Sequence, residues 1–324
     1  MKSKSTMNFN SSIKHFSSFD RDNRIDKYKA DQLTEAILDL MNDNLSSVDE
    51  LIKSESNTET LVPSIIITGM PRSGTTLLSQ LLAARYDLGY VSNLMARFYG
   101  SPLVGAWLQN QLIPKDIHDL RTFSSHHGVT KRIFEPHEFG FFWARFLNFG
   151  SDCHEPEDKN SLGKIDFHNL NSTLLNISRT FNKPVLYKCS ISPFVIQEFL
   201  LNTNIFFIHI KRNKSSVVQS VLNIRKERLG DENKWWSIRP SGWDKILNKK
   251  PSEQVSWQYD KVLNAIAEGR SGYEYRVVEI YFEELLFEPE LVLSRIMSTF
   301  MEYSGVHIAK VGTPLSASLL GTQA

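Results

Sequence analysis

Short apolar runs alternate along the chain with longer segments of helical periodicity. Four runs are rich in β-branched or aromatic residues and have the length of buried strands. These predicted strands are SIIIT at 64–68, VLYKCS at 185–190, IFFIHI at 205–210 and YRVVEIYF at 275–282. The third run is apolar apart from His209, which is typical of a strand covered on both faces of a parallel sheet.

Apolar positions three and four residues apart predict helices between these strands. The first predicted helix covers 31–44 and places Leu33, Ile37, Leu40 and Met41 on one face. Residues 46–63 have the composition of a linker, and residues 90–180 are irregular and aromatic. Further helices are expected over 74–86, 193–203, 214–229, 252–269 and 287–305. The alternation predicts an α/β fold, a three-layer parallel sheet flanked by helices, with ligands at the carboxyl ends of the strands.

The first predicted strand runs into GMPRSGTT at 69–76. The spacing G-x-x-x-x-G between a strand and a helix is that of a phosphate-binding P-loop, in which backbone N–H groups and the helix N-terminus face an anion. Nucleotide triphosphatases place a lysine after the second glycine, whereas this chain has Thr75 and Thr76 and carries its positive charge at Arg72. Since that lysine reaches the β- and γ-phosphates, its absence disfavours a nucleotide kinase or NTPase with a degenerate loop.

The segment PRSGTT resembles the 5′-phosphosulfate loop of the sulfotransferases, which use 3′-phosphoadenylyl sulfate (PAPS). The segment IFFIHIKRNKSSVVQS resembles the family's 3′-phosphate signature, an arginine at a strand end and a serine eight residues later. The resemblance implies a P-loop-type fold and a PAPS co-substrate, and it implies no metal. It assigns the 3′-phosphate to Arg212 and Ser220. It assigns the 5′-phosphosulfate to Arg72, Ser73, Gly74, Thr75 and Thr76.

The resemblance covers residues ~60 to ~305, with one departure inside the second signature. The family often has proline and aspartate between the arginine and the serine, where this chain has Lys214 and Ser216. A softer third match lies in VVEIYFEELLFEPELVLSRIMSTF, which is similar to a late strand and helix of the family. Its matching positions are Tyr281, Glu284, Leu285 and Pro289.

Sulfuryl transfer needs a base for the proton of the acceptor. Some branches of the family use a glutamate about twenty residues after the loop, but Ser92 and Asn93 stand there in this chain. The candidates therefore lie in KRIFEPHEFGFFWARF, which resembles a block of some bacterial sulfotransferases and contains Glu135, His137 and Glu138. We favour Glu138 as the base, followed by His137. The alternative is that these side chains hold their loop together by hydrogen bonds.

Three further groups of residues have two interpretations each. Lys188, at the end of its predicted strand, either touches the donor or acceptor or is an ordinary surface lysine. His126 and His127 have no partner at metal-ligand spacing and are expected to be ordinary loop histidines. Three tryptophans either line an acceptor cleft or pack in the core: Trp235, Trp236 and Trp243.

Composition limits the function further. The 324 residues are 41% apolar with a net charge of +1, which gives no sign of a nucleic-acid-binding protein. The two cysteines cannot form a disulfide framework, and we find neither a signal peptide nor a membrane span. We therefore expect a cytoplasmic protein with a flexible N-terminal arm at 1–25, a single sulfotransferase domain at 26–310 and a C-terminal tail at 311–324.

The function expected from the sequence is transfer of a sulfuryl group from PAPS to a hydroxyl or amine. The acceptor class is left open between a saccharide, a lipid and a small metabolite, and the sequence says nothing about the oligomeric state. The second alternative, beside a kinase or NTPase, is a non-catalytic protein of the same fold that binds a nucleotide or glycan.

Overall fold

A computed structural model describes residues 23–54, 62–114, 123, 125–147, 153–156 and 162–315. The expected N-terminal arm at 1–25 and C-terminal tail at 311–324 lie largely outside these residues. The description that follows concerns only the described part of the chain.

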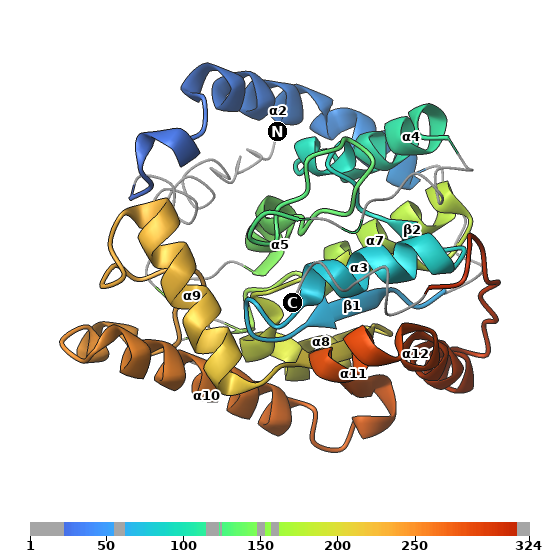
Figure 1. The fold of residues 1–324 in the computed structure, drawn as a ribbon. Helices are drawn as coiled ribbons and strands as arrows, with labels where there is room; N and C mark the ends of the chain where they lie inside the picture. The colour runs from blue at the N-terminus through green and yellow to red at the C-terminus, as the bar shows by residue number, and fades with distance from the viewer. Residues whose placement is uncertain are drawn as a thin grey trace.

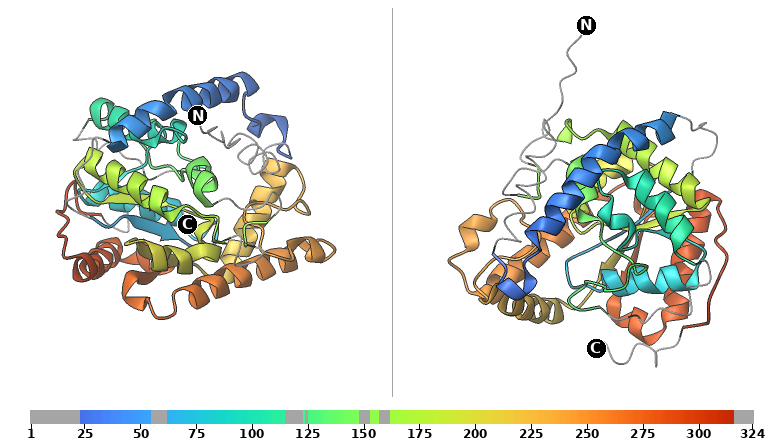
Figure 2. Two further views of the ribbon diagram at one scale, coloured as in Figure 1. Left: turned by 180° about the vertical axis from the view of Figure 1, so that it is seen from behind. Right: turned by 90° about the horizontal axis from the view of Figure 1, so that it is seen from above.

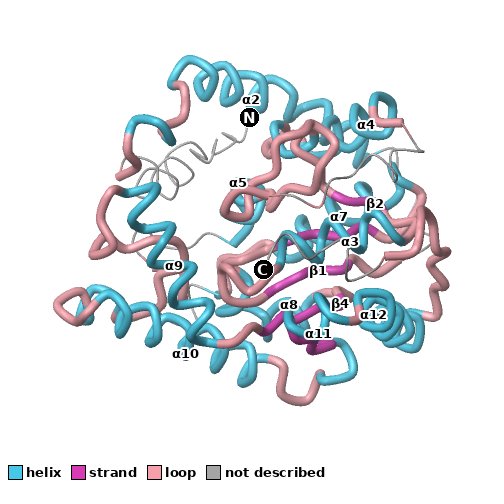
Figure 3. The backbone as a smooth tube through the Cα atoms, in the orientation of Figure 1, coloured by secondary structure: helices cyan, strands magenta, loops and turns pink. Residues whose placement is uncertain are grey.

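The centre of the molecule is a sheet of five parallel strands (Figure 3). The strands are β1 (Ile65–Thr68), β2 (Gly89–Tyr90), β3 (Val185–Lys188), β4 (Phe206–Lys211) and β5 (Val277–Tyr281). Their order is β2-β3-β1-β4-β5, and Ile66 of β1 lies between Tyr187 of β3 and Phe207 of β4. The four predicted strands and the parallel α/β sheet are confirmed. The two-residue edge strand β2 was not predicted, because it is too short to leave a pattern in the sequence.

Helices surround the sheet on both faces, as the alternating pattern predicted (Figure 1). Before β3 in the chain they are α2 (Gln32–Ser54), α3 (Thr75–Arg85), α4 (Pro102–Leu112), α5 (Gly140–Leu147) and α7 (Phe167–Phe181). Later in the chain they are α8 (Ile196–Asn202), α9 (Lys214–Leu229), α10 (Pro251–Gly269), α11 (Phe282–Phe287) and α12 (Pro289–Ser304). Short 3₁₀ turns connect them at Asp26–Tyr28, Met95–Arg97, Ser192–Val195, Trp243–Ile246 and Glu274–Arg276.

Two apolar cores, one on each face of the sheet, produce the three layers. Ile66 of β1 points into a core shared with α4, α5, α7, α8, α9 and α10. Its neighbours Ile65 and Ile67 point to the opposite face, where α3, α11 and α12 pack. Successive side chains of a strand face opposite ways, so a fully apolar strand such as β1 requires helices on both sides.

The helix α2 is longer than predicted, because residues 46–54, which we assigned to a linker, continue it to Ser54. Its anchors are polar. Asn42 accepts a hydrogen bond from the Gly100 N–H at 2.6 Å, and Asp49 accepts bonds from the N–H groups of Leu103 and Val104 at 3.1 and 3.0 Å. Apolar periodicity does not reveal such tertiary hydrogen bonds, so the C-terminal end of α2 was predicted too early.

The apolar face that predicted α2 lies on the solvent side of the helix. Leu33 and Leu40 are 69% and 64% exposed, and Ile37 and Met41 are exposed as well. Figure 2 shows α2 lying outermost, across α4 and α7. The periodicity therefore identified the helix but not the side that faces the protein. None of the described helices combines the length and the hydrophobicity needed to cross a lipid bilayer.

Candidate functional site

The loop between β1 and α3 begins the site. No side chain caps α3 at Gly74, so the N–H groups of its first turn remain for an anion. Gly74 has a φ of +100°, and a Cβ added there would come within 2.2 Å of the Phe282 ring. Arg72 also adopts the left-handed region, with a φ of +75°. Non-glycine residues held in that region cluster at ligand sites, which makes this loop a candidate ligand site.

A cavity of about 750 Å³ opens beside this loop, at the carboxyl edge of the sheet. It lies between the loop, α5 and α9, three segments that Figure 1 shows around one region. Of the described residues that line the cavity, one is an acid, Glu138. The cations among them are Arg24, Arg72, Lys188, Arg212 and Arg228. Such an excess of positive charge suits a ligand with several negative charges.

The two arginines and the serine predicted for the donor lie together on one wall. The Arg72 Nε donates to the Ser220 Oγ at 3.0 Å, and the Arg212 Nη1 donates to the Arg72 carbonyl oxygen at 3.2 Å. The Arg212 guanidinium stacks on the Phe282 ring at 4.4 Å. Burial, followed by repulsion from Arg212 and Arg228, lowers the pKa of Arg72 to about 10, which leaves it charged at neutral pH.

A lysine and a carboxylate also line the cavity. Lys188 closes β3 and is only 7% exposed. Its Nζ donates to the Thr76 Oγ1 at 2.9 Å and pairs with Glu138 at 3.1 Å. Ser190 donates to the other oxygen of Glu138. Lys188 is thus a buried bridge between the phosphate loop and the carboxylate, not an ordinary surface lysine.

The pKa of the Glu138 carboxyl lies below its ordinary value. Burial alone would raise it, but the positive charge of Lys188 and the hydrogen bond from Ser190 outweigh burial. The carboxylate is therefore ionised at neutral pH and can accept a proton, but its lowered pKa makes it a weaker base than an ordinary glutamate.

His137 lies next to this carboxylate but in a different protonation state. Burial lowers the pKa of its imidazole to about 4, so the ring is neutral at neutral pH. Its Nδ1 accepts a hydrogen bond from the Phe139 N–H at 2.9 Å. The proton of the neutral ring is consequently on Nε2, which makes His137 a hydrogen-bond donor and a poor base.

The third candidate, Glu135, turns away from the cavity. It is 3% exposed and accepts hydrogen bonds from the N–H groups of Lys131 and Arg132 at 3.0 and 2.9 Å. Asn93, at the position of the expected glutamate, donates to Thr130 at 2.8 Å. Both residues hold the loop in shape through these hydrogen bonds.

The tryptophans divide between the two interpretations. Trp236 lines the cavity. Trp235 is 4% exposed and packs against Trp243, with ring centroids 5.5 Å apart. Trp236 therefore belongs to the cavity wall, and Trp235 packs in the core.

A group that sequence reasoning missed lies at the cavity rim. His127 lines the cavity, and its Nε2 contacts the carboxylate of Glu227, which His126 and Tyr28 also contact. Glu227 lies 100 residues after His127, in the last turns of α9, so no local spacing links them. Only the fold brings them together.

Comparisons with known proteins identify a family over most of the chain. A family model described as "Sulfotransferase family" matches residues 63–302. No curated protein sequence matches the chain. Among solved structures, sulfotransferase STF9 from Mycobacterium avium is similar, with a TM-score of 0.51 and 13% identity over 90% of this chain and 78% of that one.

Two further structures have lower TM-scores. Sulfotransferase STF1 from Mycobacterium tuberculosis H37Rv gives 0.48 at 11% identity, over 97% of this chain and 91% of that one. A sulfotransferase domain from the curacin biosynthetic pathway gives 0.39 at 18% identity, over 82% and 79%. At these identities the structures bear on the fold alone, and the likeness to STF9 supports a sulfotransferase-like P-loop fold.

Proposed function

Because the chain belongs to the sulfotransferase family, we propose that it transfers a sulfuryl group from PAPS to a hydroxyl or amine, with Glu138 as the base. The observation that carries the proposal is the arrangement of the cavity. The side chains of Arg72, Arg212 and Ser220 lie together beside the loop, and an ionised carboxylate pairs with a buried lysine in the same cavity.

On this proposal the donor occupies the phosphate loop at one end and the start of α9 at the other. The 5′-phosphosulfate accepts hydrogen bonds from the first turn of α3 and from the loop residues Arg72, Ser73, Gly74, Thr75 and Thr76. The 3′-phosphate binds Arg212 and Ser220. The hydrogen bond between Arg72 and Ser220 supports the proposal. When the donor binds, each of these two side chains can give up this bond and form one with a phosphate oxygen instead. Charge-assisted hydrogen bonds of this kind contribute about 1.5–3 kcal/mol each.

The chemical step forms a bond between the acceptor oxygen or nitrogen and sulfur. It breaks the bond between sulfur and the bridging oxygen of the 5′-phosphate, which leaves adenosine 3′,5′-bisphosphate. The acceptor proton goes to the Glu138 carboxylate. Negative charge that develops near the bridging oxygen is stabilised by Arg72 and by Lys188, whose Nζ lies 2.9 Å from the Thr76 hydroxyl.

His137 has a supporting role in this proposal. Its neutral ring donates a hydrogen bond from Nε2, and the acceptor or the moving sulfuryl group is the natural recipient. The acceptor is a small molecule, glycan or lipid that reaches the Glu138 side of the cavity.

The proposal is tested by sulfate transfer. PAPS labelled in the sulfuryl group is incubated with the wild-type protein and an extract of small molecules, lipids and glycans, and the labelled product is identified. We expect labelled product with the wild type and a loss of about 10²-fold or more with Glu138→Gln. Binding of adenosine 3′,5′-bisphosphate to both proteins controls for folding.

Three results would reject the proposal. Sulfate transfer by Glu138→Gln at the wild-type rate would show that the Glu138 carboxylate is not the base. Magnesium-dependent hydrolysis of ATP or GTP without sulfate transfer would favour the kinase or NTPase alternative, and binding of the nucleotide without any transfer would favour the non-catalytic one.

A further inference from the structure

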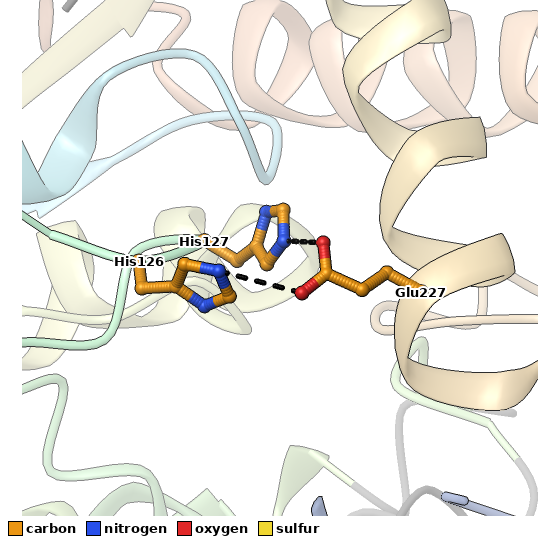
Figure 4. Close-up of side chains that lie close together, drawn as sticks. All are labelled: His126, His127 and Glu227. Atoms are coloured by element: carbon orange, nitrogen blue, oxygen red, sulfur yellow. Dashed lines mark hydrogen bonds and ion pairs between the residues drawn. The ribbon is translucent and has the colours of Figure 1, made fainter.

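Two histidines and a glutamate meet at the rim of the donor cavity (Figure 4). The Nε2 atoms of His126 and His127 both face the carboxylate of Glu227, with 3.3 Å between the His126 Nε2 and the nearer carboxylate oxygen. One ligating atom from each of the three side chains lies within 4.8 Å of the others.

The geometry points to a binding site for a divalent transition-metal ion of the zinc class, held by His126, His127 and Glu227. Two imidazoles and one carboxylate form a ligand set that suits zinc and its neighbours, whereas magnesium and calcium prefer oxygen alone. The His126 side chain is 54% exposed, so an ion can enter from solvent and keep water at its remaining position.

The two halves of the site come from elements that are themselves fixed. His126 and Val129 exchange two backbone hydrogen bonds of 3.0 Å, which closes a tight turn around the histidines. Glu227 sits on the 16-residue helix α9 and accepts a hydrogen bond from Tyr28, which orients its carboxylate. Partners of this kind, one shell outside the ion, hold a ligand in place. The positive charge of Arg228, which donates to the His126 carbonyl at 3.5 Å, limits the affinity for a dication.

An ion at this position would tie the loop at 125–130 to the end of α9. That loop borders the phosphate site, since the Thr76 Oγ1 donates to the Gly128 carbonyl oxygen at 3.2 Å. His127 itself lines the cavity. The metal would therefore act as a clasp on one wall of the donor cavity and takes no part in sulfuryl transfer.

The test is zinc binding by the full chain, freed of metal with a chelator and titrated with zinc chloride in the calorimeter. We expect one equivalent to bind the wild type, and at least about 10-fold weaker binding to His126→Ala and to Glu227→Gln. His168→Ala, which removes an exposed histidine of α7 far along the chain, should bind as the wild type does.

Thermal unfolding gives a second readout that does not depend on activity. A ligand that binds only the folded state raises the melting temperature, so zinc should raise it for the wild type and His168→Ala and not for Glu227→Gln. His126→Ala removes a largely exposed side chain and keeps the comparison valid if Glu227→Gln folds poorly. The inference is overturned if the wild type binds no zinc, or if His126→Ala binds it as tightly as the wild type.

Discussion

Arg72 occupies a left-handed backbone position in the phosphate loop, with its side chain against Ser220 and its carbonyl oxygen against Arg212. We predict that Arg72→Ala lowers kcat by about 10²-fold or more, on the scale of removing one donor that stabilises charge in the transition state. Steady-state rates of sulfate transfer measure the effect. Arg295→Ala, which changes an exposed arginine of α12, is the control and should leave kcat unchanged. Near-normal turnover by Arg72→Ala would contradict the assigned role.

Glu138 gives a prediction on pH. Its pKa is lowered because the charge of Lys188 and the Ser190 hydrogen bond outweigh burial, so the carboxylate becomes protonated only in acid. The rate constant kcat/KM should accordingly stay level from neutral pH downward and fall in acid. Lys188→Met removes the charge and should move this fall toward neutral pH. An acid limb that stays in place in Lys188→Met would show that another group controls the rate.

The sequence predicted which residues would lie together at the proposed donor site, because they belong to contiguous motifs. Arg72 lies within six residues of both loop glycines, and Ser220 lies two turns into the helix that follows Arg212. The acceptor side was predicted less well. The sequence named both Glu138 and His137 as candidate bases. The hydrogen bond to the His137 Nδ1 distinguishes them, because it makes His137 a hydrogen-bond donor and leaves Glu138 as the candidate base. The partnership of His127 with Glu227 depends on tertiary structure alone.

At the scale of elements, the apolar periodicity located four of the five strands but misjudged α2. The helix is anchored by Asn42 and Asp49, so it presents polar groups to the protein and its apolar stripe faces solvent. The helices α4, α5 and α7 fall in the region that the sequence left unassigned. In α5, Phe142 and Trp143 are both fully buried, but the helix is only 8 residues long, which is too short for its apolar spacing to be recognised in the sequence.

The anchoring of α2 gives a prediction on stability. Asp49→Ala leaves the N–H groups of Leu103 and Val104 without their carboxylate acceptor, and should lower the free energy of unfolding by about 1–2 kcal/mol. Urea titration measures this value. Asp43→Ala, on an exposed turn of the same helix, should change it by less than about 0.5 kcal/mol. Equal effects of the two changes would mean that the hydrogen bonds of Asp49 do not anchor α2.

Burial also raises the pKa of Asp49 to about 6, from an ordinary value of 3.8. A raised pKa means that the folded state binds the proton more tightly than the unfolded state. The resulting stability is complete below pH 3.8 and is lost as the pH rises through about 6. Compared with Asp49→Asn, which does not titrate, the wild type should therefore gain stability on acidification across this range.

At the scale of the whole molecule, the site is assembled from distant parts of the chain. The loop after β1, the end of β3, the start of α5 and Arg228 near the end of α9 border one cavity of about 750 Å³. The parallel sheet makes this possible, because it places the carboxyl ends of β1, β3 and β4 at the same edge. Motifs 140 residues apart, at Arg72 and Arg212, consequently touch.

The central claim is that this cavity holds the two ends of one adenylate donor, and calorimetry with adenosine 3′,5′-bisphosphate tests it most directly. The wild type should bind one equivalent without magnesium, and Arg212→Ala should bind at least about 10-fold more weakly, since a charge-assisted hydrogen bond is worth about 1.5–3 kcal/mol. Binding to Arg212→Ala with the affinity of the wild type, or no binding to the wild type at all, would contradict the account.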